Sequence, residues 1–304
     1  MKSATVTDLD DNLAQLIDKS IKQCTRENTD NCLKDIDGSP IFAEPLVGFA
    51  DGDDPLFLKY KRQEVIGAFH LTPREALEIY LREELNNTDL FVGDVSVISW
   101  IQPYTKETRI SNRTMTVGPS LRWNHSRWRS VTFLNNLNDL IINLLQDRGY
   151  WAVAPTTARF FKVLDTSRGQ ASIWSERHIA YAAGLGTFSL TDALITPKGL
   201  AMRCGSIVTN AKLPPSPRLY SNHTANCSFL ENGTCGLCAI RCPAGAITSR
   251  GHDKIKCHDY IYLELAPWVK KDGYTGGYAG CGLCMTGVPC EAKIPGKITK
   301  RFIA

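Results

Sequence analysis

The sequence lacks any long apolar segment. No stretch of its 304 residues approaches the roughly 18 uninterrupted apolar residues of a membrane-spanning helix. The first residues, MKSATVTDLDDNLAQLIDKSIKQ, contain no apolar core and no paired arginines, so they do not resemble an export signal. We therefore expect a cytoplasmic protein with no part in a membrane.

The sequence also lacks the composition of a disordered chain. Hydrophobic residues make up 43% of it and charged residues 22%, as in ordinary globular proteins. Apolar residues recur at helical spacing over 9–24 and 134–149. Thr72, Pro73 and Glu75 form the signature of a helix start, with Thr72 as the N-cap.

Buried strands are expected at 95–104, 151–155 and 205–213. Because these strands alternate with helices, the sequence predicts a mixed α/β (α+β) layer fold. The Pro- and Ser-rich stretch 212–227 marks a domain boundary. We expect an α/β cofactor- and substrate-binding domain over 1–215 and a small cysteine-rich domain over 216–304.

One cysteine is missing from an otherwise familiar pattern. The stretch ENGTCGLCAIRCPAGAI matches the bacterial iron–sulfur run C-x2-C-x2-C-x3-C-P in its last three ligands, Cys235, Cys238 and Cys242. Asn232 stands where the first ligand should be. We expect Cys227 to supply that ligand through the seven-residue loop between it and Cys235.

Eight of the eleven cysteines lie between residues 227 and 290, which is the number that two [4Fe–4S] clusters require. In two-cluster ferredoxins the last cysteine of each run binds the other cluster. On that pattern the two predicted ligand sets are Cys227, Cys235, Cys238 and Cys290, and Cys242, Cys257, Cys281 and Cys284.

Other interpretations of these cysteines are a four-thiolate zinc site, made by two C-x2-C pairs 42 residues apart, and disulfide bonds. Cys24, Cys32 and Cys204 have no companions at ligand spacing, and we expect them to be small buried side chains. The net charge of +4 counts cysteine as neutral. Two clusters at about −2 apiece bring the protein near neutrality, so the charge does not indicate a nucleic-acid partner.

A second motif precedes the cysteines. The stretch ERHIAYAAGLGTFSLTDALITPKGLAMRCGSIV resembles the epoxyqueuosine reductase family and, more distantly, the reductive dehalogenases. The resemblance rests on Glu176, the Ala183–Gly186 motif, Leu194-Ile195, Gly205-Ser206 and the cysteines that follow. It implies a nitroreductase-like cobalamin-binding domain followed by a bacterial ferredoxin-like domain with two clusters.

The resemblance implies an oxygen-sensitive oxidoreductase. Its two clusters would reduce a base-off cobalamin to cob(I)alamin, which acts on a small substrate, with electrons from an external ferredoxin- or flavodoxin-type donor. The residues that match the family's cofactor site are Gly184, Leu185, Gly186, Gly205 and Ser206. Glycines would let backbone approach a bulky flat ligand, or they would simply turn the chain.

The chain departs from the epoxyqueuosine reductases in one motif. They carry V-D-S-A-P before the glutamate, and its aspartate is the proton donor; here that position is Gln170, with Asp165 five residues earlier. An amide is not an acid, and we expect no helical-repeat extension of the kind that enlarges a tRNA-binding face in that family. Epoxyqueuosine reduction is therefore a minor alternative. Substitute proton donors would be Tyr181 or His178, which follow Glu176.

The stretch 117–130 interleaves arginines with tryptophans, among them Arg122 and Trp123. It has three interpretations: a pocket wall in which arginine binds a carboxylate and tryptophan covers the corrin, a surface loop with cation–π pairs, or a nucleic-acid patch. Two other functions also remain open. The protein could be a redox partner that reactivates another protein's corrinoid, or a plain electron carrier.

Overall fold

The fold was analysed in a computed structural model, which describes residues 6–87 and 92–303, with the backbone alone for 6–11. Its centre is a four-stranded antiparallel sheet in the order β1-β2-β8-β3. The strands are β1 (Leu46–Asp51), β2 (Ser96–Pro103), β8 (Met202–Thr209) and β3 (Ala152–Val153). In register, Leu46 pairs with Ile101, Ser96 with Thr209, and Ala152 with Thr209.

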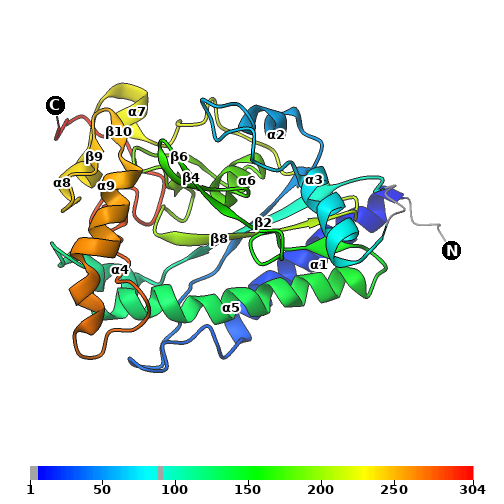
Figure 1. Ribbon diagram of the computed structural model, residues 1–304, viewed down its shortest axis with the longest axis horizontal. Helices are drawn as coiled ribbons and strands as arrows, with labels where there is room; N and C mark the ends of the chain where they lie inside the picture. Colours follow the sequence, from blue (N-terminus) through cyan, green and yellow to red (C-terminus); the bar gives the residue numbers. More distant parts are fainter. Residues whose placement is uncertain (1–5, 88–91, 304) are drawn as a thin grey trace.

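Helices cover both faces of the sheet, so β2 is buried along its whole length. Ile98 and Trp100 pack toward α1 (Val6–Glu27) and α5 (Leu121–Gln146). Val97 and Ile101 point to the opposite face, toward the second group of helices. That group comprises α2 (Pro55–Tyr60), α3 (Pro73–Ile79) with the π-helical turn η1 (Tyr80–Glu84), and α6 (Glu176–Ala182). Figure 1 shows α5 along one side of the sheet and α2, α3 and α6 on the other.

The predicted α/β (α+β) class is thus confirmed, with an antiparallel sheet and helices on both faces. The helix expected at 9–24 is α1, and the three expected strands are β2, β3 and β8. The prediction that the long helix begins near residue 134 is wrong, because α5 begins at Leu121 with Ser120 as its N-cap. The arginine- and tryptophan-rich stretch is therefore mostly helix, and the surface-loop interpretation of it is corrected.

Short elements connect this core to the cysteine-rich segment. They are α4 (Lys106–Arg113), the hairpin β4 (Val163–Thr166) with β5 (Gly169–Ser172), and the pair β6 (Thr187–Phe188) with β7 (Leu194–Ile195). The segment itself comprises α7 (Ser228–Asn232), α8 (Leu237–Ile240), β9 (Ile247–Thr248), β10 (Gly251–His252), α9 (Lys254–Asp259), η2 (Tyr260–Glu264), η3 (Ala266–Lys270) and η4 (Leu283–Met285). Figure 1 places these elements at one end of the molecule.

Charged side chains attach the cysteine-rich segment to α4. The buried carboxylate of Glu291 accepts hydrogen bonds from the Arg113 guanidinium at 2.8 and 2.9 Å and from the Gly287 amide at 2.7 Å. Arg241 donates to the Arg113 carbonyl at 2.9 Å and to the Thr286 carbonyl at 3.0 Å. Charge-assisted hydrogen bonds, some of them partly buried, therefore connect the cysteine-rich segment to α4.

No helix in the described residues combines the length and the apolar character needed to cross a bilayer.

The start of α3 provides a prediction on stability. The Thr72 hydroxyl accepts from the Glu75 amide and the Glu75 carboxylate accepts from the Thr72 amide, as the sequence predicts. We expect Thr72→Ala to lower the free energy of unfolding by about 1 kcal/mol in urea titrations. Thr132→Ala, at an exposed position within α5, should leave stability within about 0.5 kcal/mol of wild type. Equal effects of the two changes would contradict a capping role for Thr72.

Candidate functional site

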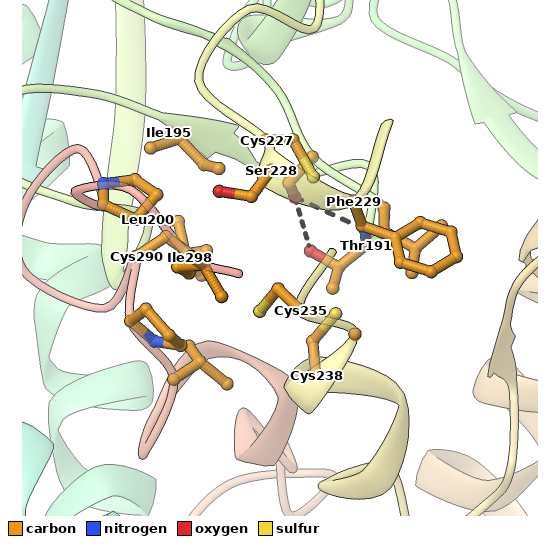
Figure 2. Close-up of a pocket in the computed structure, with 16 residues that line it drawn as sticks. Thr191, Ile195, Leu200, Cys227, Ser228, Phe229, Cys235, Cys238, Cys290 and Ile298 are labelled. Carbon is orange, nitrogen blue, oxygen red and sulfur yellow. Dashed lines mark hydrogen bonds between the residues drawn. The ribbon is translucent and has the colours of Figure 1, made fainter. Parts of the chain in front are cut away.

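Four cysteines from distant parts of the chain line one pocket. Cys227, Cys235, Cys238 and Cys290 surround it together with apolar side chains such as Ile195 and Leu200. Figure 2 shows these residues around the pocket. The membership is that of the first ligand set predicted from the sequence.

The loop that replaces the missing ligand has a definite structure. Cys227 is buried at the N-cap of α7, and Gly233 ends that helix at a φ of +72°. The side chain of Asn232 accepts a hydrogen bond from the Thr234 amide at 3.1 Å. Asn232 therefore stabilises the turn, and Cys227 lies in the pocket in its place.

The remaining four cysteines form a second group. Burial raises the pKa of Cys281 to about 12, a value that includes smaller contributions from the neighbouring thiols of Cys242 and Cys257. Burial likewise raises the pKa of Cys284, with contributions from Cys281, Cys257, Cys238 and Cys242. Cys238 and Cys284 also pack against one apolar cluster, so the two groups adjoin.

The donor set suits a metal centre. Four thiols that line one pocket are the ligand set used both by a structural zinc ion and by a [4Fe–4S] cluster. Within residues 6–87 and 92–303, no three His, Cys, Asp or Glu side chains are arranged as in a site for a single metal ion.

A large cavity, which we call the main cavity, adjoins the first cysteine pocket. Its volume is about 910 Å³, and Ser189 lines both it and the cysteine pocket. Its walls are formed by residues of α2, α6 and α9 and of the Pro- and Ser-rich stretch 212–227. Among them are Leu56, Lys59, Tyr60, Glu64, Arg168, Ser175, Arg177, His178, Tyr181, Phe188, Asp192, His223, His252 and Lys254.

Both predicted substitute proton donors line the main cavity. His178 shares a hydrogen bond of 2.8 Å between its Nδ1 and the Ser175 hydroxyl, and its ring lies 4.6 Å from that of Phe188. Burial lowers the pKa of His178 to about 3, and His70, Arg177 and Lys254 contribute. The imidazole is therefore neutral near pH 7 and is not a ready acid. Tyr181 contributes a phenolic hydroxyl group to the same cavity.

Gln170, the third catalytic candidate, lies on β5 opposite Asp165 of β4. Its amide nitrogen is 3.4 Å from a carboxylate oxygen of Asp165. Gln170 does not line the main cavity; it lines a smaller recess beneath the hairpin. The epoxyqueuosine reductases have an aspartate at this position. This chain has an amide there, and the amide lies in a recess other than the main cavity.

The glycines expected to approach a cofactor approach other parts of the protein instead. A Cβ at Gly184 would lie 2.6 Å from the Pro217 carbonyl, and one at Gly186 would lie 2.4 Å from the Ile195 carbonyl. At Gly205 the same atom would lie 2.6 Å from the ring of Trp100. These positions require glycine for close packing of protein on protein.

The other expected cofactor residues also lie outside the main cavity. Leu185 is buried in the core, and the hydroxyl of Ser206 accepts from the Trp174 indole at 3.0 Å. Arg122 forms an ion pair of 2.6 Å with Asp37, and the ring of Trp123 lies 4.8 Å from that of Tyr104. These side chains do not line the main cavity, because they are held by contacts with other parts of the protein.

Glu176 has a buried carboxylate with unusual properties. The sequence identified this residue only as part of a motif. Neither oxygen of Glu176 has a hydrogen-bond partner of good geometry among the described residues. Burial raises its pKa to about 7, although the Ser206 and Thr156 hydroxyls and Arg203 oppose the shift. The sequence signal for this site was Glu176 itself, which precedes the A-G-L-G motif by seven residues.

Comparison with known proteins gave matches among solved structures only. No family model matches the chain, and no curated protein matches it. Epoxyqueuosine reductase from Bacillus subtilis is 16% identical with a TM-score of 0.48, over 95% of this chain and 68% of that one. The enzyme from Streptococcus thermophilus is 16% identical with a TM-score of 0.47, over 95% and 69%.

A catabolic reductive dehalogenase is 15% identical with a TM-score of 0.51, over 82% of this chain and 30% of that one. Its structure is described as suggesting a mechanism for B12-dependent dehalogenation. At this identity the likeness concerns the fold. It confirms in three dimensions the resemblance seen in the sequence: the chain has a fold similar to that of a B12-dependent reductive dehalogenase, over about a third of that enzyme's length.

Proposed function

We propose that the protein is a cobalamin-dependent iron–sulfur reductase. Two [4Fe–4S] clusters, held by the two cysteine groups, would supply electrons to a cobalamin in the main cavity for the reduction of a small substrate. The observation that carries the proposal is the shared wall at Ser189, which places a pocket of four thiols directly beside a cavity containing Tyr181. An external low-potential donor of ferredoxin or flavodoxin type would feed the clusters.

The main cavity suits a bulky cofactor in size and lining. Its volume of about 910 Å³ lies near the upper end of the range for small-molecule sites. Leu56, Tyr60 and Phe188 offer apolar and aromatic surface, whereas Ser189 and Thr224 offer polar groups for an amide-bearing rim. When bound, cobalamin would supply a cobalt centre that can act as a strong reductant and nucleophile.

The side chains of the chain would then position substrate and deliver protons. The hydroxyl of Tyr181 would donate a proton to the reduced substrate atom. His178, neutral and fixed by Ser175, would keep that wall rigid and uncharged. Cys284 and Cys238 pack against the same apolar cluster, so electrons would pass from the second cysteine group to the first, next to the cavity.

The test is the absorbance of protein reconstituted with iron and sulfide without air and then mixed with cobalamin. We expect a broad band near about 400 nm, about eight irons per chain, and base-off cobalamin that stays with the protein in gel filtration. A mixture prepared with heat-unfolded protein serves as the control for non-specific retention. Protein that holds its clusters but retains no cobalamin would contradict the proposal and would favour a plain electron carrier.

A second candidate function is reduction of a corrinoid carried by another protein. It is favoured by Gln170, which replaces the expected acid and lies outside the main cavity. Turnover of small substrates by the isolated protein with a chemical reductant would exclude this candidate.

A further inference from the structure

A small recess opens beneath the β4–β5 hairpin. Its volume is about 150 Å³, which is the scale of one acidic group and its surroundings. Val65, Arg168, Ser175, Arg177, His178 and Lys254 line both this hairpin recess and the main cavity, so the two spaces adjoin. A group bound in the recess would therefore be part of, or next to, whatever occupies the main cavity.

The lining of the hairpin recess carries three cations and no carboxylate. The cations are Arg168, Arg177 and Lys254, and the rest of the lining is neutral. In the parts of the chain that the structure describes, none of the three lies within ion-pair distance of a carboxylate. Adjacent exposed positive charges repel one another, and an anion bound among them would reduce that repulsion.

Two of the cations are held in place by backbone carbonyls. Arg168 donates to the Gln63 carbonyl at 2.7 Å, and Arg177 donates to the Asp192 carbonyl at 2.8 Å. The hairpin turn lies against α9, since a Cβ at Gly169 would be 3.1 Å from that of Lys254. The two guanidinium groups are therefore positioned by backbone contacts before any ligand arrives.

The nearby acids do not line the recess, since Glu64, Asp192 and Asp253 line the main cavity instead. The Asp192 carboxylate is in the main cavity, 3.1 Å from His252. Asp165 pairs across the hairpin with Gln170 and does not line the recess. Ser175 and Gln170 add neutral hydrogen-bond donors to the recess lining. Guanidinium and ammonium groups with hydroxyl and amide donors form the usual environment of a bound carboxylate or phosphate.

We propose that the hairpin recess binds an oxyanion, a carboxylate or a phosphate, through Arg168, Arg177 and Lys254. The inference deepens the proposed function: the oxyanion belongs either to an acidic substrate or to the phosphodiester of the cofactor's nucleotide tail. In the first case the recess orients the substrate with its reacting end toward Tyr181 in the main cavity. In the second case it anchors the tail.

The experiment is calorimetric titration of the cluster-reconstituted chain, free of cobalamin, with inorganic phosphate at constant ionic strength. We expect saturable binding that weakens at least tenfold in the double variant Arg168→Gln/Lys254→Gln. The double variant Lys256→Gln/Lys270→Gln, an equal charge change at exposed positions that do not line the recess, should bind like wild type. Absent binding, or equal binding in the Arg168→Gln/Lys254→Gln variant, would overturn the proposal whether or not cobalamin binds.

Repeating the titration with corrinoids identifies the source of the oxyanion. If the cofactor's phosphodiester occupies the recess, cobalamin should abolish phosphate binding, whereas cobinamide, which lacks the nucleotide tail, should not. If the recess serves the substrate, phosphate binding should persist with either corrinoid. Failure to bind any corrinoid would sink the proposed function alone, because phosphate binding is measured without one.

Discussion

Replacement of Cys227 by serine is expected to lower the iron content of anaerobically reconstituted protein from about eight to about four atoms per chain. Cys227 lies in the pocket with Cys235, Cys238 and Cys290. The side chain of Asn232, by contrast, stabilises the turn after α7. Without the fourth thiolate the first cluster loses a ligand, whereas the second cysteine group remains complete. Iron analysis and the absorbance near about 400 nm would measure the loss.

Cys227→Ser should reduce metal binding while leaving folding almost unaffected. Cys227 occupies the N-cap of α7, and serine is among the preferred N-cap residues, so the helix itself should not suffer. Cys32→Ser, which changes a thiol outside both groups, is the matched control and should keep about eight irons. Unchanged iron in the Cys227 variant would show that the displaced-ligand interpretation is wrong.

The second large effect concerns Glu176. We expect Glu176→Gln to raise the free energy of unfolding by about 3 kcal/mol at pH 8 and to change it little at pH 4.5. The native carboxyl has a pKa of about 7, raised by burial from an ordinary 4.5. Between these values the native state binds more protons than the unfolded state, so wild type loses stability as the pH rises.

The variant lacks this pH-dependent loss because glutamine does not ionise. Urea titrations at several pH values would show two curves that separate as the pH rises from about 4.5 to about 7 and then run parallel. Glu83→Gln, the same chemical change at an exposed position, should leave the pH dependence of wild type intact. A constant difference between Glu176→Gln and wild type at all pH values would argue that packing, not charge, determines the effect.

The sequence predicted those parts of the fold that depend on local patterns. The helix start at Thr72 follows from a capping signature of neighbouring residues, and β2 follows from a continuous apolar run. The start of α5 did not follow, because Arg122, Trp123 and their neighbours lack an apolar stripe; tertiary contacts such as that of Trp123 with Tyr104 stabilise this end. The β4–β5 hairpin combines the apolar Val163 and Leu164 with polar residues and is partly exposed on both faces, so it gives no alternating strand signal.

The candidate site divides in the same way. Cysteine spacing sufficed to group thiols that lie more than 50 residues apart, such as Cys227 and Cys290, because cluster ligation obeys a strict count. No comparable rule identifies from sequence the residues that line the main cavity. Its walls come from segments as distant as Lys59 and His223, and only tertiary packing brings them together. The glycines after α6 show why spacing alone can be ambiguous. Their spacing suits the approach of a ligand, as predicted from the sequence, and it suits equally the close packing of protein on protein that is observed.

Arg241 lies between two cysteines of different groups, Cys238 and Cys242, and donates hydrogen bonds to carbonyls of α4 and of the loop that carries Cys284. Were these cysteines to hold iron–sulfur clusters as proposed, cluster binding and attachment of this segment to α4 would depend on the same interactions. By thermodynamic linkage, stronger binding of α4 to this guanidinium would then raise the affinity for iron, and bound iron would protect α4 against proteolysis. Cluster assembly and the final folding of the chain would then be one cooperative process.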